Sequence, residues 1–319
     1  MKVQVADRPN LGVLANNSRA TLFFEPIWAD ALRAAFPNLR FRYLELEEDG
    51  RITAFLPVVN VPHGRLQEIV SMPFGTHGGA LALPEATPAG LGLLHDRFIA
   101  YLRSPRVFRY ELTTYDPPEV METDLVKKLG RHLVRSVAPV LDLGRGEKAI
   151  WADYDQQLRR SVRRAGKAGV VVQRGLAHFN TFFDLYTRQS REWSLPWHHQ
   201  RDRLESMLGV LGDQAEIWIA SYEGQPLCTQ LALYQPGRDM HFWISGARPE
   251  SRPLAAYHFL LNAIILDAAR RGFMECHFGS SLGNPEVEHF KLAYGAAPRP
   301  LLRFFHQPRW VGWIQKLRW

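Results

Sequence analysis

Cysteine is scarce in this sequence: Cys228 and Cys276 are the only two among 319 residues. Each lies in an apolar stretch, where a thiol behaves as a small buried hydrophobic group, so no disulfide framework is indicated. The sequence also lacks an apolar run approaching the roughly 20 residues that span a bilayer. Its first ten residues contain no apolar segment typical of a secretory signal. We therefore expect a cytoplasmic protein.

Metal-binding motifs are missing as well. The twelve histidines show no HExxH pattern and no CxxC partner. Adjacent His198 and His199 would point in different directions on a helix or a strand. We therefore expect no metal site.

Acidic residues are absent between Asp155 and Asp184, although the chain as a whole is mixed in charge. The net charge is +7, and the basic excess lies after Arg145, where 22 Lys and Arg face 16 Asp and Glu. The gap contains a dense basic cluster, which favours either a phosphate-rich partner or a solvated helix face. The cluster comprises Arg159, Arg160, Arg163, Arg164 and Lys167.

The apolar content, 46% of 319 residues, is ample for a folded core and the length suggests two domains. Hydrophobic periodicity predicts a helix, an antiparallel meander, a long helix, a strand, a short helix and a strand, and then the same order again. This repetition predicts an α+β fold in two tandem domains, each a mixed, mainly antiparallel sheet flanked by helices. We expect boundaries at residues 1–145, 146–306 and an amphipathic tail at 307–319.

Three segments in the second half carry a family resemblance. They are the basic stretch Leu158–Ala165, the strand Trp243–Ala247, and His277-Phe278-Gly279-Ser280-Ser281 followed by Phe290-Lys291 and Gly295. In this order they resemble the Fem-like peptidoglycan-bridge aminoacyltransferases and related GNAT acetyltransferase domains. The loop Ser71–Gly79 resembles the matching loop of that family's first domain. The resemblance implies tandem GNAT-like domains and amide formation from an acyl-CoA or an aminoacyl-tRNA, without a tightly bound cofactor.

The resemblance also implies a site between Phe278 and Gly295. Lys291 matches the family's Phe-Lys motif and would steady phosphate or developing charge, while His277 and His289 could relay a proton. The expected substrate-binding residues are Phe278, Gly279, Ser280, Ser281, Phe290, Tyr257, Trp243, Arg188 and Arg191. A surface lysine and packed histidines are the plain alternatives.

The donor stays open between acyl-CoA and aminoacyl-tRNA. The stretch Arg248–Ala256 has no glycine, unlike the usual phosphate-binding turn of a GNAT enzyme, which weakens the CoA case. The basic cluster Arg159–Lys167 favours tRNA. The tail places Trp310, Trp313, Ile314 and Leu317 on one helical face, which could contact an anionic membrane or its own domain.

Two other function classes compete. Gly279-x-Ser281-x-Gly283 follows a strand, as in a serine hydrolase, but Asn284-Pro285 interrupts the helix that such a motif needs. No aspartate follows Ser281 to complete a catalytic triad. A GNAT-like protein that binds ligand without turnover is the remaining alternative.

Overall fold

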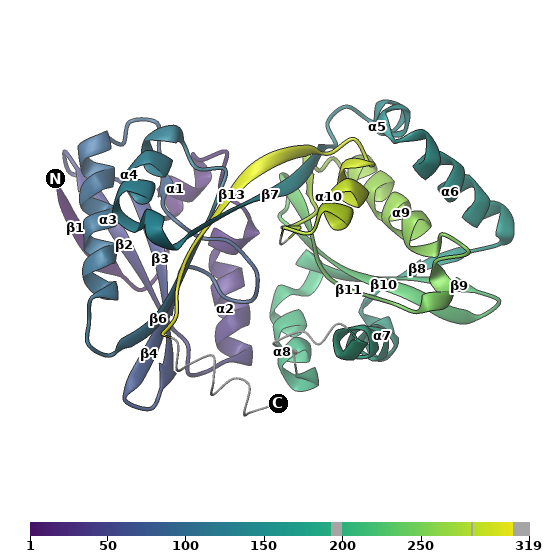
Figure 1. Ribbon diagram of the computed structural model, residues 1–319, viewed down its shortest axis with the longest axis horizontal. Coiled ribbons are helices and arrows are strands. Elements are labelled where there is room, and N and C mark those ends of the chain that lie inside the picture. Colours follow the sequence, from purple (N-terminus) through teal and green to yellow (C-terminus); the bar gives the residue numbers. More distant parts are fainter. Residues whose placement is uncertain (193–199, 282, 309–319) are drawn as a thin grey trace. The chain divides into compact units, whose positions relative to one another are not determined.

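The computed structural model describes residues 1–192, 200–281 and 283–308 (Figure 1). The chain divides into two compact units. Residues Met1–Ser136, with residues 300–308, form the first unit, and Val137–Arg299 form the second. In the described ranges, no helix is long and apolar enough to cross a bilayer.

The first unit is built on an antiparallel meander. Its strands are β1 (Lys2–Ala6), β2 (Arg40–Glu48), β3 (Arg51–His63), β4 (Leu66–Val70), the short β5 (Leu81–Ala82), β6 (Val107–Tyr115) and the end of β13 (Ala297–His306). The order across the sheet is β1-β2-β3-β4-β6-β13, and β5 pairs with β3. Asp49 and Gly50 join β2 to β3 with φ values of +49° and +76°, as the Asp-Gly hairpin signal predicts.

Helices cover both faces of this sheet (Figure 1). They are α1 (Leu11–Ala15), α2 (Pro26–Ala35), α3 (Pro88–Leu102) and α4 (Glu119–Leu129). On one face, Leu94 and Phe98 of α3 and Leu125 of α4 pack with Leu44 and Leu56 of the meander in a single buried cluster. Burial of these apolar side chains, at about 25 cal/mol per Å², is what fixes α3 and α4 on the sheet.

The second unit repeats the same plan. Its strands are the end of β7 (Leu133–Asp142), β8 (Val171–Arg174), β9 (Ala215–Tyr222), β10 (Gln225–Tyr234), β11 (Asp239–Ala247) and β12 (Glu275–His277). The order is β7-β12-β11-β10-β9-β8. The helices are α5 (Glu147–Asp153), α6 (Gln156–Ala168), α7 (Phe179–Glu192), α8 (Arg201–Leu211), α9 (Ala256–Arg270) and α10 (Pro285–Leu292).

Helices α5, α6 and α9 lie on one side of this sheet, and α7 and α8 lie on the other (Figure 1). On the α9 side, Leu158 and Val162 of α6 pack with Leu260 and Ile264 of α9 and with Cys276 of β12. On the opposite side, Gly246 of β11 allows α7 to approach so closely that a Cβ atom there would lie 2.5 Å from the backbone of Leu185. Single-turn 3-10 helices occur at Leu22–Phe24, Gly130–His132, Leu176–His178, Gly212–Gln214 and Pro249–Ser251.

The compact units differ from the boundaries expected from sequence. The sequence assigns the strand at Leu301–Phe305 to the second domain, but Leu301–His306 pairs antiparallel with β6 of the first unit. Conversely, Val140–Asp142 of β7 pairs with β12 of the second unit. The glycines after Leu143 mark the end of a strand and not the change of unit, because backbone pairing with a distant strand decides where β7 belongs.

Candidate functional site: the divergence of β11 and β12

Two parallel strands of the second unit part after a short paired stretch. Strand β11 pairs with β12 from Asp239↔Glu275 to His241↔His277 and no further. Beyond this point the amide of Phe278 donates to the carbonyl of Pro139, at 3.0 Å, on the other side of β12. Strand β11 continues to Ala247, where it pairs with β10. After His241, β11 therefore no longer pairs with β12.

A β-bulge lies on β11 at the same place. Leu231 pairs with Ile244 and the next residue, Ala232, pairs with Phe242, so Trp243 is the extra residue. A bulge re-aims backbone groups and side chains, and bulges are common beside active sites. Trp243, which the sequence analysis expected to bind substrate, thus marks the irregular point of the divergence.

Lys291 of α10 holds the loop that follows β12. Its Nζ donates hydrogen bonds of 2.9 Å to the carbonyls of Gly279 and Ser280. Its side chain is buried, and burial lowers the pKa of Lys291 to about 8, with Glu288 opposing the shift. The ammonium therefore satisfies two loop carbonyls and sets the path of the chain at the divergence.

Ser281 follows these carbonyls and is also buried. Its hydroxyl has no hydrogen-bond partner among the described residues. A hydrolytic nucleophile requires a base within hydrogen-bond reach. The described part of the chain provides none for Ser281, which argues against the serine-hydrolase alternative. Leu282, the next residue of the Gly-x-Ser-x-Gly motif, lies outside the described residues.

The start of α9 packs against α10 through aromatic rings. Phe290 stacks on Tyr257 with ring centroids 6.0 Å apart, and it lies 5.0 Å from the ring of His258. The Tyr257 hydroxyl donates to Oε1 of Gln230 on β10 at 2.8 Å. Of the residues expected to bind substrate, Tyr257 and Phe290 are therefore in contact, and their stacking fixes α10 on α9.

Ala255 makes the turn before α9, where the sequence has no glycine. This residue adopts a left-handed conformation, with φ +52° and ψ +32°, and no side chain caps the helix. Left-handed backbone costs a residue with a Cβ atom roughly 1–2 kcal/mol. The turn that a glycine usually makes is therefore present here without one.

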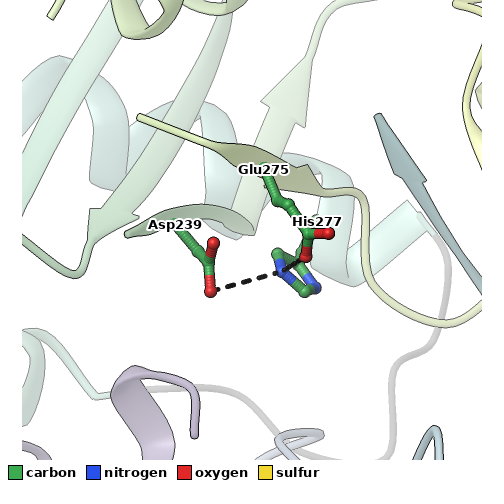
Figure 2. Close-up of side chains that lie close together, drawn as sticks. All are labelled: Asp239, Glu275 and His277. Carbon is green, nitrogen blue, oxygen red and sulfur yellow. Dashed lines mark ion pairs between the residues drawn. The ribbon is translucent and has the colours of Figure 1, made fainter. Parts of the chain in front are cut away.

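A second group of ionisable side chains lies on the other face of the sheet (Figure 2). Cys276 packs in the α9-side core, so its neighbours Glu275 and His277 project to the opposite face. His277 Nε2 lies 3.4 Å from Oε2 of Glu275 and 3.8 Å from Oδ2 of Asp239. The His277 ring also stacks on His241, at 4.3 Å between centroids.

Arg299 fixes the charge of this group. It hydrogen-bonds to both carboxylate oxygens of Glu275, at 3.0 Å to Oε2 and closer to Oε1. Burial opposes ionisation of Glu275, but His277 and Arg299 outweigh it and lower the pKa of Glu275 to about 2. Burial raises the pKa of Asp239, and His277 offsets part of that effect. Ligand atoms of Asp239, Glu275 and His277 lie within 4.8 Å of one another, but Arg299 already neutralises Glu275.

The remaining predicted site residues do not gather at one place. His289 is exposed on α10, whereas His277 is buried on the face opposite α9. Arg188 and Arg191 are exposed near the end of α7, where Arg188 pairs with Glu192 at 3.3 Å. Trp193 and Trp197, which follow these arginines in the sequence and could stack on a base or sugar, lie outside the described residues, as does the tail from Arg309 onward.

Sequence reasoning missed Asp239, His241 and Arg299. The signal was visible in part, since Asp239-x-His241 and Glu275-x-His277 each place two polar side chains on one face of a strand. Which two strands would lie side by side was not visible, because β11 and β12 are separated along the chain by α9.

The corresponding strands of the first unit do not part in this way. There the parallel pair is β4 and β6, and the loop after β4 turns back along β6. The Ser71 amide donates to the Glu111 carbonyl and the Gly78 amide to the Thr113 carbonyl, each at 2.9 Å. The loop Ser71–Gly79 thus continues the pairing with β6 beyond the end of β4.

Comparison with known proteins finds a family match in the second half of the chain and similar folds over nearly all of it. Residues 152–292 match the model of the acetyltransferase (GNAT) domain. A crystal structure of FemX is similar over 98% of this chain and 100% of its own, with a TM-score of 0.69 and 11% identity. A tandem GNAT protein from the clavulanic acid biosynthesis pathway covers 96% of this chain and 99% of its own, with a TM-score of 0.61 and 14% identity.

A third similar structure is the C-terminal domain of a putative lysylphosphatidylglycerol synthetase from Agrobacterium fabrum. It covers 91% of this chain and 88% of its own, with a TM-score of 0.51 and 14% identity. No curated protein sequence gives a significant match. At these identities the solved structures establish the fold, and the predicted α+β fold of two tandem GNAT-like domains is confirmed. The resemblance to Fem-like and GNAT-type acyltransferases is likewise confirmed.

Proposed function

We propose that this chain, with its tandem GNAT-type fold, is an N-acyltransferase whose second unit carries out the transfer. The observation that carries the proposal is the divergence of β11 and β12, with its bulge at Trp243 and a loop held by Lys291. It lies within the segment that matches the GNAT domain. The acceptor class is an amine of a cell-envelope glycan, a peptide or a related small precursor.

The reaction needs few side chains. A neutral amine attacks the acyl carbonyl, a C–N bond forms, and the bond from the acyl carbon to the sulfur or oxygen of the carrier breaks. The amine loses one proton and the leaving group takes up one. Holding the two reactants together can supply several kcal/mol. Backbone N–H groups at the bulge would stabilise the oxyanion, a role in which one donor typically contributes about 3 kcal/mol.

Lys291 contributes by holding the loop and supplying positive charge. Its ammonium already donates to two carbonyls, so the third N–H remains for charge that develops on substrate. Because burial lowers the pKa of Lys291 to about 8, the ammonium loses its proton in mildly alkaline solution. We therefore expect the transfer rate to gain a declining limb as the pH rises through about 8.

The start of α9 suits a phosphorylated carrier. The first amides of a helix have no partners inside the helix, and they attract anions. Ala255 supplies the left-handed turn before them, and Arg248 and Arg252 lie in the preceding loop. This geometry supports acyl-CoA as the donor, although the sequence lacks the usual glycine-rich turn. Aminoacyl-tRNA remains the other candidate.

The test incubates purified protein with labelled acyl-CoAs or aminoacyl-tRNAs, with and without RNase, against amino-sugar and peptide acceptors. We expect transfer to at least one amine, and RNase-insensitive transfer would exclude the tRNA donor. Substitution Lys291→Met should lower kcat/KM about 100-fold and remove the declining alkaline limb. The matched variant Lys127→Met changes an exposed lysine of α4 and should leave turnover unchanged.

Three outcomes would contradict the proposal. Donor binding without transfer to any acceptor would favour a non-catalytic binding protein. A fluorophosphonate adduct on Ser281, with ester hydrolysis lost in Ser281→Ala, would favour a hydrolase. Full turnover in Lys291→Met would remove Lys291 from the site.

A further inference from the structure

Helix α6 carries an uncompensated positive charge. Five of its residues are basic and none is acidic. Arg160, Arg163, Arg164 and Lys167 are exposed, and within the described ranges no ion pair joins them to a carboxylate. Elsewhere in the same unit arginines are paired: Arg174 and Arg271, for example, share Asp267 at 2.7 and 3.4 Å. The field of α6 is therefore directed to a ligand or to solvent.

The first half of α6 forms one wall of a groove with α5. Trp151, Gln156, Arg159, Arg160 and Arg163 line a volume of about 520 Å³, which lies in the range of small-molecule sites. The guanidinium of Arg163 lies 5.4 Å from the centre of the Trp151 ring. Arg159 donates to the carbonyl of Ala152, so its planar group is held at the groove.

The chemistry of these groups matches one class of ligand. Arginine binds phosphate through paired N–H groups. An indole stacks on a nucleobase, which is worth about 1–3 kcal/mol, and the glutamine amide can both donate to and accept from the edge of a base. A membrane surface fits less well, because Leu158, Val162 and Ala165, the apolar side of α6, are already buried in the core.

We infer that this α5–α6 groove binds a phosphorylated nucleoside, with Trp151 against the base and Arg160 and Arg163 on phosphate. The groove lies within the proposed catalytic unit and is joined to the end of α10: the amide of Asp155 donates to the carbonyl of Ala293, at 2.8 Å, two residues beyond Lys291. Both candidate acyl carriers contain phosphorylated adenosine. Assigning the nucleoside to the carrier rests on the proposed function, whereas the binding itself does not.

Calorimetric titration with four defined probes tests the groove. Adenosine 3′,5′-bisphosphate represents a CoA-type source, and a 12-residue oligoadenylate represents an RNA source. Pyrophosphate and adenosine supply the phosphate and the base alone. We expect at least one of the first two to bind about tenfold or more tightly than either partial probe, because stacking and charge-assisted bonds act together. Whichever of the two binds identifies the source.

Variants then locate the binding. Arg160→Gln with Arg163→Gln should weaken nucleotide binding about tenfold or more and reduce the dependence of log K on log salt by about 1–2. The control, Arg103→Gln with Lys127→Gln, removes the same charge from exposed positions directly after α3 and on α4 of the first unit, and should change affinity less than about twofold. Trp151→Leu should weaken binding while Trp151→Phe restores it, with thermal unfolding confirming that both fold.

The inference fails if no nucleotide binds, if the double arginine variant binds as the native protein does, or if pyrophosphate binds as tightly as the nucleotides. These results are separable from the test of catalysis. Nucleotide binding without any acyl transfer would contradict the proposed function and support the nucleotide-binding groove. Acyl transfer without nucleotide binding would support the proposed function and contradict the groove.

Discussion

Glu275 shows how single residues set the electrostatics of the second unit. Its carboxylate is half-buried, a position that by itself would raise its pKa, yet His277 and Arg299 lower the pKa to about 2. A carboxyl whose pKa falls on folding stabilises the protein above its ordinary pKa of 4.5, and that stabilisation disappears as the pH falls towards 2. A shift of this size corresponds to about 3 kcal/mol.

We predict that Arg299→Met lowers the free energy of unfolding by about 2–3 kcal/mol at pH 6, because Glu275 then remains buried without its cation. Near pH 2.5 the difference from the native protein should shrink, since most of the stabilisation from the lowered pKa of Glu275 is lost as the pH falls from 4.5 towards 2. Urea unfolding at the two pH values measures this. The control Arg145→Met breaks the exposed pair with Asp153 and should cost less than about 1 kcal/mol. An equal loss at both pH values would contradict the account.

At the scale of elements, the two units use the same pair of parallel strands differently. In the first unit the loop Ser71–Gly79 fills the edge of β6. His77, bonded to Thr21 at 3.0 Å and packed 4.7 Å from the ring of Tyr115, anchors it. Gly79 makes the close approach possible: its φ is +91°, and a Cβ atom there would lie 2.8 Å from Thr114. In the second unit Lys291 fixes the loop after β12 through hydrogen bonds to the carbonyls of Gly279 and Ser280. The loop that follows the first strand of each parallel pair is therefore fixed by different contacts in the two units.

We predict that Gly79→Ala destabilises the protein by about 2–4 kcal/mol, because it adds a steric clash to the cost of left-handed backbone. Gly50→Ala is the matched control, since Gly50 has φ +76° and nothing within 4 Å of the new Cβ atom. It should cost only about 1 kcal/mol. Chemical unfolding of both variants compares them, and equal losses would show that the loop does not pack against β6 as described.

At the scale of the whole molecule, the two units are not consecutive pieces of chain. Strand β7 begins among residues of the first unit and pairs with β12 of the second, and β13 begins in the second unit and pairs with β6 of the first. The sheet of the second unit therefore contains β7, which follows α4 of the first unit. The sheet of the first unit contains β13, which follows α10 of the second unit. A strand lost from the edge of a sheet leaves unpaired backbone groups and exposed apolar surface.

We predict that fragments 1–145 and 146–319 do not fold independently, because fragment 1–145 lacks β13 and fragment 146–319 lacks β7. Circular dichroism and denaturant titration of each purified fragment measure this. Co-expression should recover more folded material than either fragment alone, and cutting within the exposed turn at Gly237 should be tolerated better. Cooperative unfolding of fragment 1–145 alone would overturn the prediction.

Local sequence determined the elements well where a single local cause dominates. Helical periodicity predicts helices at residues 201–211 and 89–102, and the structure has α8 at Arg201–Leu211 and α3 at Pro88–Leu102. The Asp49-Gly50 turn likewise predicts the hairpin of β2 and β3. Gly272, with φ +80°, ends α9 as expected. The short elements β1, β5, α1, α5 and β8 escaped prediction, because a few residues carry too little periodicity and tertiary contacts hold them.

The sequence by itself determined the class of fold and the repeated order of elements, and it predicts a site in the segment around Lys291. Tertiary structure decided what Lys291 touches, that His277 and His289 lie apart, and that Asp239, His241 and Arg299 join His277 and Glu275. It also decided which unit receives each edge strand. The physical reason is that propensity and periodicity act between neighbours along the chain, whereas strand order, the divergence of β11 from β12 and charge pairing depend on residues separated by a whole helix or more.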